Sequence, residues 1–177
     1  MIERRVNIRP KDLSLRYFVL FAGIVCFTLL EPGLSFPPQA RAAGPITPSG
    51  LNTQVNPAPV SPPGKVQYDI TGGFRPGGGA NLFHSFGDFN VPTNNIANFL
   101  NDSGLATSNI LGRVTGGNVS NIFGAIQTTG FGAANLFLMN PAGFLFGPNA
   151  TVNVGGMMTF TTADYLRLAD NVRFNAL

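Results

Sequence analysis

The residues best suited to chemistry are His84, the only histidine, and Asp88, four residues later. A catalytic or metal site needs several such groups converging on one point. The chain supplies few others, because Cys26 is its only cysteine and its two glutamates, Glu3 and Glu31, both precede residue 42. We therefore expect His84 to be a structural histidine on a strand, and we expect no catalytic residue, metal or cofactor.

The first 42 residues have the features of a secretory signal peptide. Basic residues open the chain, and an uncharged run of 14 residues, Tyr17 to Leu30, follows. Ala40 and Ala42 place small residues where a signal peptidase reads the chain. This pattern predicts a signal peptide over residues 1–42, with cleavage between Ala42 and Ala43. The uncharged run is shorter than the roughly 20 residues that span a bilayer, which disfavours a membrane anchor.

Charges balance after residue 42, where five Lys/Arg stand against five Asp, so the net charge of +3 comes from the signal peptide. Nucleic-acid binding requires a clustered basic face, and none remains, so no nucleic-acid partner is expected. No cysteine remains either. The exported chain must therefore be stabilised by packing rather than by disulfides.

The most regular stretch is Ala134 to Gly156. It holds three short apolar runs, and the turn signals that separate and end them are Asn140–Gly143, Gly147–Asn149 and Gly155–Gly156. Each run is too short for a stable helix. Three strands per circuit would form a coil of about 22 residues, a spacing typical of solenoids. The stretch therefore predicts one three-sided coil of a parallel β-helix.

The segments before this coil are less regular. We expect residues 43–64, which are rich in Pro, Ser, Asn and Thr, to form an extended linker, with the folded domain over residues 65–177. Alternation of apolar and polar residues predicts strands at Val66–Ile70, at Asn81–Val91 with a kink at Gly87, and at Ile110–Val114. Residues 98–109 are expected to form a loop. Gly124 is expected to mark a β-bulge between two apolar pairs.

Two weak internal repeats support stacked coils. Ala-Asn-Leu-Phe occurs at residues 80–83 and 134–137, and Asn-Ile-Phe-Gly at 121–124 resembles Phe-Leu-Phe-Gly at 144–147. The 20 glycines after residue 42 disfavour helices. The expected fold is thus an all-β, three-sided solenoid. Asparagines can stack in ladders along such a solenoid; the candidates are Asn135, Asn140, Asn149 and Asn153.

The β-helix expectation raises an enzymatic alternative, because secreted parallel β-helices include polysaccharide lyases and hydrolases. Their chemistry needs carboxylates and basic groups gathered in one groove. The aspartates and arginines of this chain are scattered along the sequence. We therefore predict that the protein is not an enzyme and keep the lyase or hydrolase as the weaker alternative.

Three blocks, NLFHSFGDFNV, ILGRVTGGNVSNIFGAI and ANLFLMNPAGFLFGPNATVNVGGMMTFTTAD, together resemble the N-terminal secretion domain of filamentous haemagglutinins, the haemagglutination activity domain of two-partner secretion systems in Gram-negative bacteria. The resemblance covers roughly Val66 to Phe174. It implies a right-handed parallel β-helix with extra N-terminal capping strands. Members of this family usually carry a long passenger after this domain, so we expect the domain here to be truncated at its C-terminal end.

The resemblance implies that the domain is an export signal. An outer-membrane β-barrel transporter would bind it through periplasmic recognition domains, and the chain would then be secreted or held at the cell surface. The family signature Asn-Pro-Asn-Gly stands here as Asn140, Pro141, Ala142 and Gly143, and these four residues are the candidate transporter-recognition motif. The family's Asn-Pro-Asn-Leu motif has no match. The alternative function is a stand-alone adhesion module that binds a host-cell receptor or a glycan.

Overall fold

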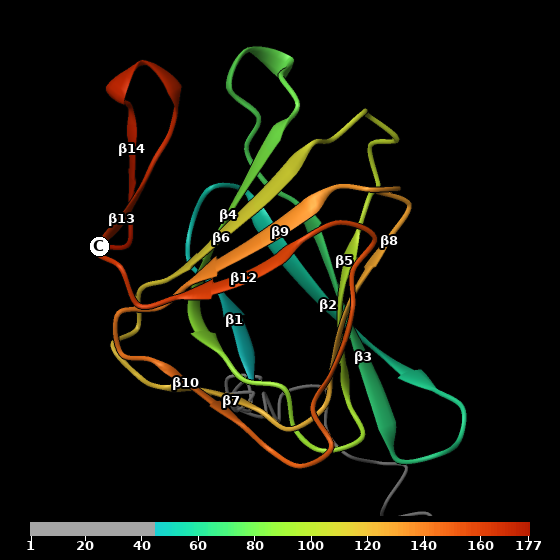
Figure 1. Ribbon diagram of the computed structural model, residues 1–177. Coiled ribbons are helices and arrows are strands. Elements are labelled where there is room, and N and C mark those ends of the chain that lie inside the picture. Colours follow the sequence, from blue (N-terminus) through green and yellow to red (C-terminus); the bar gives the residue numbers. More distant parts are fainter. Residues whose placement is uncertain (1–44) are drawn as a thin grey trace, which may run out of the picture. The chain divides into compact units, whose positions relative to one another are not determined.

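The computed structural model describes residues 45–177 (Figure 1). The predicted signal peptide, and its cleavage site between Ala42 and Ala43, lie outside the described residues. No helix within residues 45–177 is long and apolar enough to cross a membrane.

The described chain winds into stacked coils with three faces. The first face has the strand order β1 (Ile46–Pro48), β4 (Asn81–Phe89), β6 (Asn109–Val114), β9 (Asn135–Met139) and β12 (Met158–Thr161). The second face contains β7 (Ser120–Ile122) and β10 (Phe144–Phe146). The third has the order β11 (Thr151–Asn153), β8 (Ala125–Thr129), β5 (Ile96–Leu100), β3 (Lys65–Gly72) and β2 (Thr53–Val60). This arrangement confirms the predicted parallel β-helix.

Successive coils stack in parallel register, and their lengths differ. Asn81 pairs with Asn109, Asn109 with Asn135, and Leu136 with Met158, so these steps span 28, 26 and 22 residues. The 22-residue prediction therefore holds for one step only. The repeat at 80–83 and 134–137 lies in exact register, two coils apart. The other repeat is misaligned by one residue, because Asn121 pairs with Leu145.

Apolar side chains from all three faces fill the interior of the solenoid. On β4, Leu82 and Phe86 point into this core, and Ile110 and Leu136 stack on the same face in the next two coils. Full burial of one such side chain contributes about 1.5–3 kcal/mol. The expected kink at Gly87 coincides with a register irregularity between β1 and β4, where Pro48 pairs with Phe86 and Ile46 with Phe89.

Residues 46–60 are not a linker, which corrects the prediction for residues 43–64. β1 pairs antiparallel with β4, and β2 pairs antiparallel with β3 over its whole length. Together they form the N-terminal cap. Pro57 and Pro59 lie within β2, which is at the edge of its sheet. Proline is tolerated there because an edge strand leaves one row of its N–H groups without a partner strand, and proline lacks only its N–H.

Two further predictions were wrong. Residues 98–100, the start of the expected loop at 98–109, belong instead to the strand β5: Ala97 and Phe99 are fully buried, and Asn98 between them is buried with its amide hydrogen-bonded. Gly124 is not a bulge but the corner between β7 and β8. A Cβ there would lie 2.3 Å from the Asn95 carbonyl oxygen, so only glycine allows the coils to approach this closely.

After β12 the chain forms a hairpin of β13 (Tyr165–Arg167) and β14 (Arg173–Asn175), joined by the short 3-10 helix η2 (Ala169–Asn171). A second 3-10 helix, η1 (Pro76–Gly78), precedes β4. Phe174 of the hairpin packs in a second buried cluster with Phe83, Leu111 and Met139 of the first face. The hairpin therefore covers part of the outer surface of the solenoid.

Candidate functional site

The motif Asn140–Gly143 forms the corner between β9 and β10. The Gly143 N–H donates to the Asn140 carbonyl at 2.9 Å, which closes a β-turn. The Ala142 N–H donates to the Asn140 side-chain oxygen at 3.0 Å. Gly143 has φ of +103°, a conformation that other residues rarely adopt. Asn at the first position, Pro at the second and Gly at the fourth are thus residue types that favour this turn, whereas its third position tolerates most residues.

The Asn140 side chain is fully buried and uses all of its principal hydrogen-bonding groups. Its Nδ2 donates to the Asn118 carbonyl and to Ser120 Oγ, each at 2.9 Å, in the preceding coil. The Asn140 N–H donates to the Thr161 carbonyl of the following coil at 3.0 Å. One asparagine therefore ties three successive coils together at this corner.

The other three residues of the motif are more accessible. Pro141, Ala142 and Gly143 are each half-buried, and Leu145 beyond them is exposed. Residues 144–146 form β10, the strand that follows the corner. Only Phe144 is partly buried against the core, where its ring lies 5.2 Å from that of Phe160. The corner thus combines a buried anchor with a surface of Pro, Ala and Leu.

Asparagine ladders exist, but they use different residues from most of those predicted. Asn135 does stack: its Nδ2 donates to Asn109 Oδ1 at 3.0 Å, and Asn109 Nδ2 donates to Asn81 Oδ1 at 2.9 Å. Asn140 belongs to the corner network instead. Asn149 and Asn153 belong neither to this ladder nor to a second ladder, described next, on the third face.

The ladder on the third face is built from mixed polar side chains. Asn98 Nδ2 donates to Asp69 Oδ1 at 2.7 Å, and Gln127 Nε2 donates to Asn98 Oδ1 at 3.3 Å. Thr129 Oγ1 also donates to Asn98 Oδ1, at 2.7 Å. This ladder satisfies the polar side chain that lies buried within β5.

His84 and Asp88 do not form a catalytic pair through a hydrogen bond. The His84 ring is buried beside Phe86 and Phe99, and its Nδ1 lies 3.4 Å from Thr53 Oγ1 of the N-terminal cap. Burial lowers the pKa of His84 from 6.5 to about 4. The Asp88 carboxylate instead accepts a hydrogen bond from Asn118 Nδ2 at 2.9 Å. Within residues 45–177, no group of three or more His, Cys, Asp or Glu side chains could hold a metal ion.

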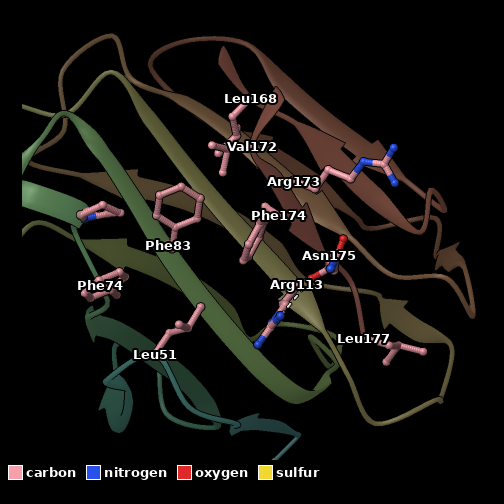
Figure 2. A pocket seen from close by; sticks show the side chains of 11 residues that line it. Leu51, Phe74, Phe83, Arg113, Leu168, Val172, Arg173, Phe174, Asn175 and Leu177 are labelled. Carbon is pink, nitrogen blue, oxygen red and sulfur yellow. Dashed lines mark hydrogen bonds between the residues drawn. The ribbon is translucent and has the colours of Figure 1, made fainter. Parts of the chain in front are cut away.

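Sequence reasoning missed an apolar groove of about 360 Å³ beside the β13–β14 hairpin. In Figure 2 the rings of Phe83 and Phe174 lie between Leu168 and Val172 on one side and Leu51 and Phe74 on the other. Its walls come from segments far apart in the chain, so local periodicity could not reveal it. The available signal was the pair of apolar positions in residues 166–168, after the last predicted coil.

The stacked coils, the N-terminal cap and the Asn140 corner define a capped parallel β-solenoid over residues 45–177. A family model described as "TPS secretion domain" matches the same residues, 45–177. The chain therefore belongs to the family of two-partner secretion domains found in filamentous haemagglutinin-type proteins. No curated protein sequence matches the chain significantly.

Membership of the family defines the function at a coarse level. The chain contains the N-terminal domain of a two-partner secretion substrate, and this family is a secretion module rather than an enzyme family. Such domains have a partner transporter in the outer membrane, and their export implies a secreted or surface location. The family expected from the three sequence blocks is thereby confirmed.

Proposed function

We propose that the partner transporter recognises this domain at the corner formed by Asn140, Pro141, Ala142 and Gly143, and that the exported domain is then presented at the cell surface. The observation that supports this proposal most is the Asn140 network, which joins three coils and fixes the backbone of the following residues. Pro141 and Ala142 are held in one conformation at half-exposed positions. A fixed, partly exposed turn is suited to recognition because little conformational entropy is lost when a partner binds it.

Within this proposal the residues have separate roles. Asn140 positions the turn, and its side chain is too deeply buried to contact a partner that binds the folded domain. Pro141 and Ala142 form the contact surface, and the exposed Leu145 extends it along β10. Ala142 presents only a methyl group where the family signature has asparagine. Contact at this position would therefore be apolar rather than hydrogen-bonded.

The test compares two prolines in successive corners of one coil. Pro141→Ala changes the proposed contact surface, whereas Pro148→Ala changes the exposed proline of the next corner. Each variant is co-expressed with the cognate transporter, secreted and periplasmic amounts are measured, and denaturation midpoints are recorded. We expect Pro141→Ala to lower the secreted fraction beyond its loss of stability, and Pro148→Ala to follow stability alone. Equal secretion of the two variants at equal stability would refute recognition at this corner.

Adhesion by the domain itself is the second candidate function. The observation that favours it is Phe74, whose side chain is 51% exposed at the wall of the apolar groove. Binding of the exported domain to host cells or to a glycan array, compared with a Phe74→Ser variant, tests this candidate. Undiminished binding of that variant would remove the groove from any adhesive role.

A further inference from the structure

The groove beside the hairpin carries positive charge on an apolar surface. Eleven residues line it, and none of them is acidic. Arg113 supplies its charge, because the Arg173 guanidinium points away from the rings in Figure 2 and lies over Tyr165, with its Cζ 4.3 Å from the ring centroid. Arg113 comes from β6 and donates through Nε to Ser85 Oγ at 3.1 Å and through Nη1 to the Asn175 carbonyl at 3.0 Å. Both acceptors are neutral, so these hydrogen bonds leave its charge uncompensated.

The apolar part of the groove lies next to this charge. Phe83 and Phe174 stack edge to face with ring centroids 5.0 Å apart, and the Arg113 Cζ lies 5.4 Å from the Phe174 centroid. Phe74 forms a wall and is half-exposed, although its backbone already pairs with that of Phe83. Neither the packing of the core nor the pairing of the strands requires an aromatic side chain at this position.

A strand edge borders the same groove. β14 pairs with β13 alone within the described sheets, so its other edge has no partner strand there. The Asn175 carbonyl on β14 is the atom that Arg113 holds, which places this edge beside the guanidinium (Figure 2). Unpaired strand edges beside apolar pockets accept extended peptides, because the backbone supplies affinity and the pockets supply specificity.

We propose that this groove binds an extended segment of a protein partner in which an apolar residue is followed, two positions later, by an acidic residue. Side chains at i and i+2 of a strand lie on one face, about 6.6–6.8 Å apart. That spacing lets an apolar side chain rest on Phe83 and Phe174 while a carboxylate reaches Arg113. A carboxylate bound to guanidinium makes a strong, charge-assisted hydrogen bond. This surface is distinct from the Asn140 corner and does not depend on recognition there.

The test uses the exported chain and the fluorescein-labelled peptide acetyl-Ser-Phe-Thr-Glu-Thr-Ser-amide, with binding followed by fluorescence anisotropy. Two matched peptides carry Gln in place of Glu or Ser in place of Phe. We expect each replacement to weaken binding about tenfold, in line with the loss of a charged hydrogen bond or of a buried aromatic side chain. Dodecanoate serves as a competitor, because a lipid would also join an apolar chain to a carboxylate.

Protein variants locate the site. Phe74→Ser and Arg113→Gln should each weaken peptide binding several-fold or more. Val152→Ser, at a similarly exposed valine on β11, should leave peptide binding unchanged. Equal binding of the Glu and Gln peptides, equal effects of Phe74→Ser and Val152→Ser, or tighter binding of dodecanoate than of the peptide would each overturn the proposal. If Arg113→Gln releases the hairpin, Phe74→Ser and the peptide pair still decide the outcome.

Discussion

Replacing Asn140 by Ala should destabilise the domain more than replacing any other residue of the Asn140–Gly143 corner by Ala. The substitution removes hydrogen bonds to the Asn118 carbonyl, Ser120 Oγ and the Ala142 N–H. Ser120 is fully buried and loses its partner without access to water, which costs about 1–3 kcal/mol. The other two groups are more accessible, and their lost bonds cost about 0.5–1.5 kcal/mol each. The expected loss is therefore roughly 2–6 kcal/mol.

Urea denaturation of the exported wild-type and Asn140→Ala proteins measures this loss through the midpoint and slope of the transition. Pro141→Ala is the matched control, because it mainly increases the freedom of the unfolded chain and should cost only about 0.4–1 kcal/mol. An Asn140→Ala variant that loses less than Pro141→Ala does would refute the argument. It would mean that the buried side chain does not hold the corner to the preceding coil.

Three further predictions concern the glycine corners and the buried histidine. Gly143→Ala should lower the free energy of unfolding by about 1–2 kcal/mol, because alanine is strained at φ of +103° even though no atom lies within 4 Å of the added Cβ. Wild-type stability of this variant in a thermal melt would contradict the prediction. Gly124→Ala should prevent the tight stacking of β7 and β8 on the preceding coil, because the added Cβ would lie 2.3 Å from the Asn95 oxygen. The expected result is loss of the cooperative unfolding transition, measured by circular dichroism. His84 has a folded pKa of about 4 against 6.5 when exposed, so the unfolded chain takes up the proton first as pH falls, and about 3 kcal/mol of stability should be lost between pH 6.5 and pH 4. A His84→Gln variant with the same pH dependence as the wild type would show that other groups cause any such loss.

The sequence predicted the solenoid because its strongest signals are local. The coil at 134–156 shows its turns as Asn-Pro-Ala-Gly, Gly-Pro-Asn and Gly-Gly, and the corresponding strands β9, β10 and β11 are present. The strand at 96–100 was missed because buried Asn98 interrupts its apolar character. That asparagine is tolerated only because Asp69 and Thr129, from neighbouring coils, satisfy its amide. No local pattern contains this information.

The N-terminal cap was missed for a related reason. Judged by local sequence alone, the prolines in residues 57–63 indicate an extended linker. The backbone of β2 is indeed extended, but it is paired in a sheet. Its incorporation depends on β3, which offers a complete antiparallel partner, and on the edge position that tolerates Pro57 and Pro59. The groove beside β14 was equally hidden, since residues 51, 74, 113 and 174 meet only after the coils have stacked.

The same comparison explains how the solenoid tolerates coils of different length. The pairs Asn81–Asn109 and Asn109–Asn135 keep both their strand register and their side-chain hydrogen bonds, although the two steps differ by two residues. The extra residues must therefore be absorbed between the strands, and residues 101–108 form such a segment between β5 and β6. Because loop-closure entropy grows slowly with length, these insertions cost little compared with a shift of register, which would turn every core side chain outward. The polar ladders thus help to fix the strand register in residues 45–177, which contain no cysteine, and Asn140 has the same role at the corner that the transporter is proposed to recognise.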